Sequence, residues 1–211
     1  MSLPVIVIGA GGHGKVVADA LQAAGRKVLG FVDPKLAGKR VIGLPVLGGD
    51  EVLRRYSPNK VELANGRGSA SDLPGERKRL FEEKKALKFR FVQVIHPSAT
   101  VSRHARLGEG VQVMAGAVIQ ADTHVDRNCI VNTGATIDHD CRIGAHCHIA
   151  PGVTLSGSVQ IGAESHIGVG AIVIQEIRIG TRVLVAAGAV VVDNVADGKL
   201  VMGVPAEVQK K

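Results

Sequence analysis

A repeat of six residues runs through the second half of the chain without interruption. Every sixth residue from Ile95 to Val191 is Ile, Leu or Val, which gives seventeen aliphatic residues in phase. The residue four positions after each of them, from Ala99 to Val195, is small or β-branched. Neither the 3.6-residue period of a helix nor the two-residue alternation of a strand accounts for this pattern. The repeat therefore predicts a β-solenoid.

The two regular positions of the hexad have a physical reason. One large aliphatic residue per hexad fills the interior of a narrow coil, and the small fifth residue fits where the chain turns a corner. A single hexad cannot bury its aliphatic residue, so stability comes from stacking of successive coils. The pattern resembles that of the hexapeptide-repeat acyltransferases, whose left-handed parallel β-helix takes three hexads per coil. This resemblance implies about five to six coils, and it indicates the fold more than the function, because the same scaffold carries different acyl acceptors.

Charge is distributed unevenly along the chain. The net charge is +7, with 17 Lys and Arg against 9 Asp and Glu in residues 1–94, and 9 against 10 in residues 95–211. Two explanations stay open for the basic first half: solvated helix faces, or an attractive field for a phosphorylated ligand. Only 2% of the residues are aromatic, which suits the thin core of a solenoid.

The three cysteines, Cys129, Cys141 and Cys147, all occupy the fifth position of their hexads. We expect buried structural thiols and no metal site, because the repeat contains no ligand spacing typical of a metal centre. The N-terminus lacks a charged segment followed by a long apolar run, and no stretch approaches 18 apolar residues. We therefore expect no signal peptide, no transmembrane helix and no membrane or nucleic-acid partner, with the cytoplasm as the default location.

The first half opens with a strand, a glycine-rich turn and a helix. Residues 4–8 are apolar, Gly9, Gly11 and Gly14 match the spacing G-x-G-x-x-G, and helical spacing follows. Glycines let the backbone approach a ligand closely, and a helix start offers N–H groups to a phosphate. A second strand over residues 27–32 ends at Asp33. The Asp33 carboxylate either accepts hydrogen bonds from a ribose or base, or caps the turn before Pro34.

Strands and helices alternate up to residue 94. We expect a short strand at residues 46–47, a helix over 50–56, a strand over 61–64, a helix over 72–87 and a strand over 89–94. This alternation predicts a small parallel sheet covered by helices. The expected domains are a Rossmann-like domain over residues 1–94 and a β-helix domain over residues 95–211. Ligands of such sheets bind at the carboxyl ends of the strands, where the glycine turn, Asp33, Asn65 and Gly66 fall.

A Rossmann-like front joined to a hexapeptide-repeat body resembles the nucleotide-sugar acetyltransferases of the PglD, PerB and NeuD type, over nearly the whole chain. In that family the front domain binds the nucleotide of an amino-sugar acceptor and has no nicotinamide role. The segment from Leu63 to Gly68 is more similar to the NeuD branch, which leaves the nucleotide and the sugar open. The resemblance implies that the nucleotide sugar is bound by Gly9, Gly11, Gly12, His13, Gly14, Asp33, Lys35, Asn65 and Gly66.

Polar and titratable residues concentrate between Val131 and His148. His139 is the third residue of its hexad, so its ring is expected to project outward, with Asp138 and Asp140 beside it. Acetyl transfer to an amine needs a base, and imidazole titrates near neutral pH. A neighbouring carboxylate would hold the tautomer and favour the imidazolium. The residues alone leave two interpretations of His139, a solvated side chain or a general base.

The motif Asn-Thr-Gly-x-x-x-Asp-His-Asp-Cys at residues 132–141 resembles the PglD-like family residue by residue. This resemblance implies that His139 is the general base, that Asp140 orients it and that Asn132 lies in the acceptor pocket. His124, His146 and His166 lack this support and are expected at the surface.

Acetyl-CoA is the co-substrate that the resemblance implies. His148 would contact the acetyl donor, and the backbone N–H of Gly157 would stabilise the thioester oxygen as it becomes an oxyanion. The pantetheine arm would lie along the coils beyond His148. The residues expected along it are Gly168, Ala171 and Ala186, with Lys199 at the nucleotide end of CoA.

These features favour an acetyl-CoA-dependent N-acetyltransferase acting on the amino group of a nucleotide-linked amino sugar. The alternatives are an O-acetyltransferase of a sialic-acid-like sugar, a nucleotide-binding solenoid without turnover, and a dehydrogenase. The outward His139-Asp140 pair counts against a protein without turnover, and no hydride-transfer residue is evident. The resemblance also implies a homotrimer, because the acyl site of related proteins lies in the cleft between neighbouring β-helices.

Overall fold

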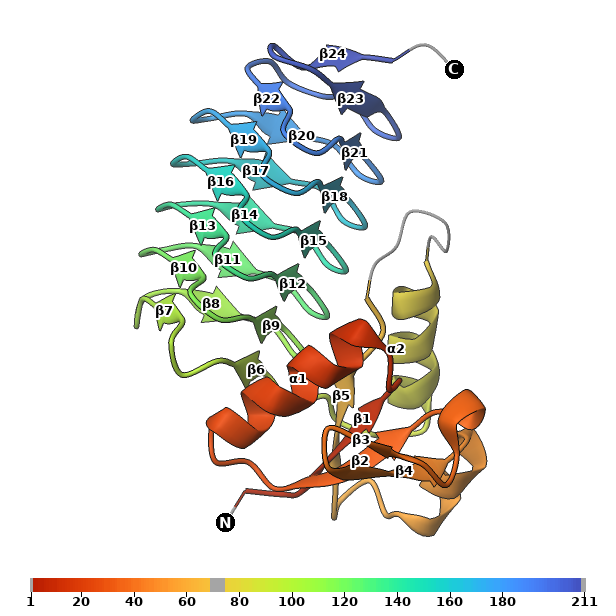
Figure 1. Ribbon diagram of the computed structural model, residues 1–211. Coiled ribbons are helices and arrows are strands. Elements are labelled where there is room, and N and C mark those ends of the chain that lie inside the picture. Colours follow the sequence, from red (N-terminus) through yellow and green to blue (C-terminus); the bar gives the residue numbers. More distant parts are fainter. Residues whose placement is uncertain (1, 69–74, 210–211) are drawn as a thin grey trace. The chain divides into compact units, whose positions relative to one another are not determined.

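The computed structural model describes residues 2–68 and 75–209, and the chain forms two compact units, residues 1–97 and 98–211. The first unit contains a parallel sheet with helices, and the second is a left-handed parallel β-helix (Figure 1). The fold class expected from the sequence is therefore confirmed. No helix within the described ranges is long and apolar enough to cross a membrane.

The sheet of the first unit has the strand order β3-β4-β2-β1-β5. β1 (Val5–Ile8) pairs in parallel with β2 (Val28–Val32) and with β5 (Glu62–Asn65), and β2 pairs in parallel with β4 (Leu44–Gly48). β3 (Arg40–Val41), which the sequence pattern did not reveal, adds an antiparallel edge to β4. The carboxyl ends of β1, β2 and β5 therefore meet at one edge of the sheet.

Within the described residues, the first unit also contains the helices α1 (Gly12–Ala23), η1 (Pro34–Leu36), η2 (Asp50–Arg55) and α2 (Glu76–Ala86), of which η1 and η2 are short 3₁₀-helices. Residues 72–74, the start of the helix expected over 72–87, lie outside the described residues.

The strand expected over residues 89–94 is wrong. Only β6 (Val94–Ile95) is a strand there, and Phe91 makes an isolated bridge to Leu63. Phe89 and Phe91 are buried in the core of the first unit, and the ring centroids of Phe91 and Phe81 are 4.5 Å apart. Packing of these aromatic side chains thus decides the path of the segment.

The β-helix has three faces, each named here after one of its strands. The β13 face contains β7 (Thr100–Val101), β10 (Val118–Ile119), β13 (Thr136–Ile137), β16 (Thr154–Leu155), β19 (Ile172–Val173) and β22 (Val190–Val191). The β14 face contains β8 (Arg106–Leu107), β11 (His124–Val125), β14 (Arg142–Ile143), β17 (Gln160–Ile161) and β20 (Arg178–Ile179). The β15 face contains β9 (Gln112–Val113), β12 (Ile130–Val131), β15 (His148–Ile149), β18 (His166–Ile167), β21 (Leu184–Val185), β23 (Leu200–Met202) and β24 (Glu207–Val208).

Successive coils stack in an 18-residue register. Thr136 pairs with Thr154, Arg142 with Gln160 and His148 with His166, all in parallel. Parallel pairing places the side chains of paired residues in one column on the same face. The chain therefore has three columns of outward side chains, one on each face.

The first and fifth residues of each hexad point into the coil. From Val111 onward these positions are buried, and the three cysteines are at most 1% exposed, as the hexad pattern predicts. Where the fifth residue carries a donor, it bonds the carbonyl oxygen fifteen residues further on. These pairs are Thr123 to Asp138, Cys129 to Gly144, Cys141 to Ser156, Cys147 to Gly162, and Ser165 to Gly180.

The inward and outward positions of one strand give a matched test of this packing. Ile161 is 3% exposed and its neighbour Gln160 points outward. We predict that Ile161→Ala lowers the free energy of unfolding by about 2–5 kcal/mol, because it leaves a cavity in the coil. Gln160→Ala should change it by less than about 0.5 kcal/mol. Thermal and urea unfolding followed by circular dichroism measure both, and equal losses would contradict the assignment of the inward position.

Candidate active site

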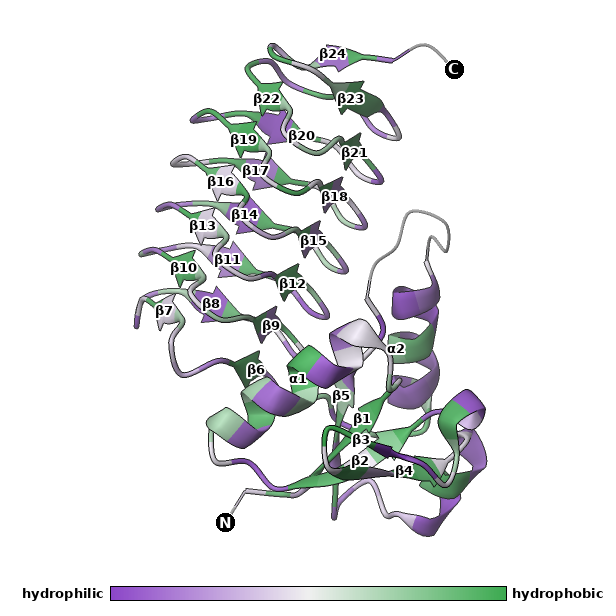
Figure 2. Cartoon of the chain, in the orientation of Figure 1, coloured by the Kyte–Doolittle hydropathy of each residue, from purple (hydrophilic) through white to green (hydrophobic). Residues whose placement is uncertain are grey.

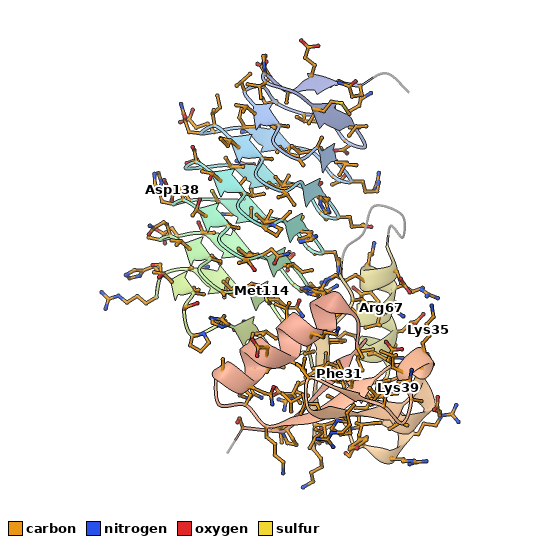
Figure 3. The ribbon with its side chains drawn as sticks, in the orientation of Figure 1. Phe31, Lys35, Lys39, Arg67, Met114 and Asp138 are labelled. Atoms are coloured by element: carbon orange, nitrogen blue, oxygen red, sulfur yellow. The ribbon has the colours of Figure 1, made fainter. Side chains whose placement is uncertain are left out.

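His139 lies at the corner that follows β13, where Figure 3 labels its neighbour Asp138. The His139 backbone N–H donates to Asp138 Oδ1 at 2.8 Å, and His139 Nδ1 is 2.7 Å from Asp140 Oδ2. The side chain is 59% exposed, so it projects outward as the sequence predicts. The hydrogen bond to Asp140, and then the charge of Asp138, raise the pKa of His139. Because the carboxylate accepts from Nδ1–H, Nε2 carries the lone pair that can take a proton.

The backbone of this corner is held by the coils on either side. Asp140 has a φ of 59°, a left-handed conformation that Asp tolerates better than most residues. Its N–H donates to the carbonyl of Ala121, and the carbonyl of His139 accepts from Ser158 N–H at 2.9 Å. The imidazole and its carboxylate are therefore presented on a backbone whose position the stacking fixes.

Gly157 follows His139 by one coil and lies against its ring. A Cβ atom on Gly157 would be 2.6 Å from His139 Cε1 and 2.7 Å from Nε2, so only glycine leaves room for the imidazole in this position. Among the residues that the structure describes, none accepts a hydrogen bond from the Gly157 N–H. An open backbone donor thus lies beside the basic nitrogen.

A second group of polar side chains is formed by Asn132, after β12, and His148, on β15. Asn132 Oδ1 accepts from Thr133 N–H at 2.9 Å, which turns the amide nitrogen toward His148 Nε2 at 3.1 Å. An amide nitrogen can only donate, so Nε2 of His148 is the acceptor and the neutral ring carries its proton on Nδ1. The rings of His166 and His148 meet edge to face, with their centroids 4.7 Å apart.

His166 is not the surface residue that the sequence suggested. Burial lowers the pKa of His166, and its ring packs against that of His148. The 18-residue register causes this contact, because it places the two rings in one column of the β15 face.

The two groups lie at opposite edges of the β13 face. Asn132 precedes β13 and His139 follows it, so one side of the coil separates them. A hexad in extended conformation spans up to about 20 Å. One chain therefore does not bring His139 and Gly157 together with Asn132 and His148.

The residues expected along the pantetheine arm of CoA differ in exposure. Gly168 and Ala186 follow Asn132 at multiples of 18 residues, so the three occupy one edge of the β-helix. A Cβ on Gly168 would be 2.6 Å from the backbone nitrogen of Ala187, which explains the glycine. Ala171 is 0% exposed and occupies the inward fifth position, so the expectation that its side chain lines a groove is wrong. Lys199 is exposed before β23.

The glycine loop of the first unit is built by close packing. Gly9 has a φ of 97°, and a Cβ on Gly14 would overlap the Gly9 carbonyl oxygen. Gly12, His13 and Gly14 form the first turn of α1 and not a loop ahead of it. Gly11 caps α1 without a side-chain hydrogen bond, and the first turn contains no acidic residue. The helix start therefore keeps N–H groups and a positive dipole end that suit an anion.

Asp33 has the turn-capping role that the sequence left open. Its Oδ1 accepts from Lys35 N–H and its Oδ2 from Ala10 N–H, both at 3.0 Å, so the carboxylate joins η1 to the glycine loop. Asp33 also lines a cavity of about 210 Å³ at the carboxyl edge of the sheet, together with Gly9 and Arg67. Lys35 is exposed beside it in η1 (Figure 3).

Asn65 and Gly66 are buried and hold the loop, and the expectation that they contact the nucleotide sugar stays a prediction. Asn65 is 1% exposed; its amide nitrogen donates to the Arg77 carbonyl and its Oδ1 accepts from Arg67 N–H. Gly66 is buried, and a Cβ there would be 2.5 Å from the Gly9 carbonyl oxygen. Their polar and small character serves the packing of the β5 end against the β1 end.

The sequence interpretation missed Arg67. Its Cδ would be 3.5 Å from a Cβ on Gly9, so its side chain lies across the glycine loop, and its Nη2 is 3.7 Å from Glu76 Oε1. The Arg67 side chain is 43% exposed, which leaves the guanidinium accessible to a ligand. Its place directly after Asn65-Gly66, at the end of a parallel strand, was the available signal.

Another groove of the β-helix lies away from these residues. A groove of about 690 Å³ runs along the β14 face past Arg142, Gln160 and Arg178, and none of the site residues above lines it. No group of three or more His, Cys, Asp and Glu in the described parts of the chain is placed to hold a metal ion.

The electrostatics of His139 can be tested without any substrate. We predict that Asp140→Asn lowers the pKa of His139, because it removes the acceptor that favours the imidazolium, while Asp138 still raises it. NMR titration of ring-labelled histidine measures the pKa, with His139→Gln to identify the signal. Asp193→Asn, on the same edge three coils further on, is the control and should leave the value unchanged. An equal pKa in the wild type and in Asp140→Asn would contradict the contact.

Two family models match the chain. The model described as the PglD N-terminal domain matches residues 4–71, and the model of the bacterial transferase hexapeptide, six repeats, matches residues 104–139 and 122–157. The two matches fall in the first and second units respectively.

Solved structures similar to the chain cover its full length. The acetyltransferase domain of PglB from Neisseria gonorrhoeae, also solved with acetyl coenzyme A, is 42% identical with a TM-score of 0.93, over 99% of this chain and 100% of that one. PerB from Caulobacter crescentus, in complex with CoA and GDP-perosamine, is 42% identical with a TM-score of 0.91, over 100% of both chains.

A curated relative matches a shorter region. UDP-N-acetylbacillosamine N-acetyltransferase from Bacillus subtilis is 39% identical over 117 residues, which are 53% of this chain and 51% of that protein. The matched region is thus about half the length of this relative.

Proposed function

Because the chain belongs to the PglD- and PerB-like nucleotide-sugar acetyltransferases, we propose that it transfers the acetyl group of acetyl-CoA to the amino group of a nucleotide-linked amino sugar. The observation that carries this proposal is the His139 imidazole, which has a raised pKa and lies beside the open N–H of Gly157. PerB, similar over its full length, was solved with both CoA and GDP-perosamine.

His139 and Gly157 supply the two elements that acyl transfer needs. The amine nitrogen attacks the thioester carbon, His139 Nε2 takes the amine proton, the C–N bond forms and the C–S bond breaks. Asp140 holds the ring through Nδ1 and stabilises the imidazolium that results. Gly157 N–H donates to the thioester oxygen as negative charge develops on it. The proton on His139 can then pass to the departing CoA sulfur.

The first unit binds the nucleotide part of the acceptor in this proposal. The α1 start and the Gly9–Gly14 turn take the diphosphate, and Arg67, whose side chain lies across Gly9, adds the positive charge that faces it. Asp33 and Lys35 flank the nucleoside from the end of β2. The division of labour is thus acceptor binding in residues 1–94 and acetyl transfer in residues 95–211.

We propose that the chain assembles as a homotrimer through the β13 face. We also propose a cytoplasmic location, which the three cysteines support because none of them forms a disulfide. The outward residues of this face are Thr and aliphatic, and Ile172 is 42% exposed, whereas the β14 face carries Arg106, Arg142 and Arg178 (Figure 2). An uncharged, partly apolar face suits a second copy better than the arginine-bearing β14 face does.

Assembly around the β13 face also completes the site. Both edges of that face then lie at subunit boundaries, so His139 and Gly157 of one protomer can meet the Asn132 and His148 of the next. His148, a neutral ring with its proton on Nδ1, would there contact the acetyl donor, and CoA would extend along the edge formed by Asn132, Gly168 and Ala186.

The activity is tested with acetyl-CoA and a panel of UDP-, GDP- and dTDP-linked amino sugars, with a free sialic acid as the hydroxyl acceptor, following thiol release. We predict turnover on an amino sugar and a kcat about 10²–10⁴-fold lower in His139→Ala, with little change in the KM for acetyl-CoA. The acid limb of the wild-type pH profile should disappear in the variant. Turnover of the free sialic acid alone would establish an O-acetyltransferase, and no turnover at all would contradict an enzyme.

The shared site is tested by mixing two inactive chains. We predict that trimers containing both His139→Ala and His148→Ala chains, co-expressed with different tags and purified through both, recover about one third of wild-type activity, because each ring then contains one intact boundary. Each variant alone is the control. Mixed trimers no more active than the single variants would place both histidines in one protomer.

A further inference from the structure

A buried thiol lies directly behind the proposed catalytic corner. Cys141 is 0% exposed, and its Sγ–H donates to the Ser156 carbonyl at 3.2 Å. Burial raises the pKa of the Cys141 thiol to about 11, so the sulfur keeps its proton, and remains a donor, at neutral pH. The proposed chemistry does not use this thiol.

The carbonyl that Cys141 bonds belongs to the peptide unit that links Ser156 to Gly157. A trans peptide is planar, and its C=O and N–H point in opposite directions. The Ser156 carbonyl is turned into the coil toward Cys141, so the N–H of the same peptide unit, which belongs to Gly157, is turned outward to the surface where the His139 ring lies.

Three other residues at the third hexad position use this N–H in a local hydrogen bond. The N–H groups of Arg127, Thr133 and His139 each donate to a side-chain oxygen of the preceding Asp or Asn. At Gly157 the preceding residue is Ser156, and no acceptor occurs within the described chain. The Gly157 N–H is therefore outward and open to a ligand oxygen.

The column of inward residues that contains Cys141 carries donors only beside the site. Val159 and Ile177 occupy the same column one and two coils further on, so coil stacking accepts an aliphatic residue there. Thr123 and Cys141 bond the carbonyls of Asp138 and Ser156, which belong to the peptide units that lead into His139 and Gly157. The inward donors of this column thus contact the two peptide units that lead into His139 and Gly157.

We propose that Cys141 is a positioning residue that holds the Ser156-Gly157 peptide so that the Gly157 N–H points at the thioester oxygen. This role rests on the proposed acetyl transfer. Without the thiol the Ser156 carbonyl has no inward donor, and the peptide can tilt toward water. The Gly157 N–H then points at the developing oxyanion in only a fraction of the enzyme molecules. This slows the chemical step without changing how acetyl-CoA binds.

The test compares Cys141→Ala, Cys141→Val and Cys141→Ser with Cys129→Ala, on the acceptor that the wild-type chain turns over. Cys129 occupies the same hexad position and bonds Gly144 O at 3.0 Å, on the edge between the β14 and β15 faces, away from His139. Cys141→Val introduces the residue type that Val159 provides one coil further on, and its side chain fills the space of the thiol. It therefore replaces Cys141→Ala in the test if that variant does not fold. Thermal midpoints, kcat and the KM for acetyl-CoA are measured for each.

We expect kcat to fall about 10-fold in Cys141→Ala and Cys141→Val, less than the ~10²–10³ that deletion of an oxyanion donor costs. The KM and the acid limb set by His139 should stay in place, and Cys141→Ser, which keeps a donor, should return kcat to within about twofold of wild type. Cys129→Ala should lower the thermal midpoint as much as Cys141→Ala and leave kcat unchanged.

Two results would overturn the role of Cys141. One is a folded Cys141→Ala or Cys141→Val trimer with wild-type kcat, and the other is a shift of the acid limb, which would mean that the thiol acts through His139. A wild-type chain without turnover on any acceptor overturns the proposed function itself, and the role of Cys141 with it.

Discussion

Coil stacking in an 18-residue register is the constraint on which the rest of this structure depends. The hydrogen bonds that join successive coils run between backbone groups, so they fix the neighbours of every residue whatever side chains occur there. Gly157 lies against His139, and His166 against His148, for this reason. The inward side chains stabilise the coils by packing, and the outward side chains at the corners are available to bind ligands or to react.

The same register separates the site into two halves. His139 and Gly157 occupy one edge of the β13 face, and Asn132, Gly168 and Ala186 occupy the other, because each column runs parallel to the axis of the β-helix. A rigid coil cannot fold one edge onto the other. In the proposed trimer, copies arranged around the β13 face would bring the two unlike edges together without any change of conformation.

The first unit builds its site by a different principle. The end of β1 packs so closely against the first turn of α1 and the end of β5 that side chains at Gly14 and Gly66 would meet the Gly9 carbonyl oxygen. The side chains of Asp33 and Asn65 form hydrogen bonds that hold these loops together. The α1 start, with its positive dipole end, and the partly exposed guanidinium of Arg67 are general binders of anions, so they would carry little information about a sugar.

The sequence by itself determined the β-helix, the inward and outward positions, the buried cysteines and the outward projection of His139, because a hexad repeat constrains each residue through its immediate neighbours in the chain. Only the tertiary structure decided that Asn65 binds backbone and that Phe89 and Phe91 pack into the aromatic core, where Phe91 keeps a single bridge to Leu63 of β5. It also decided the proton position on His148 and the orientation of the Gly157 N–H. These features depend on hydrogen-bond partners 12 to 16 residues away or on side-chain packing, and such contacts exist only once the coils have stacked and the sheet has closed around its core.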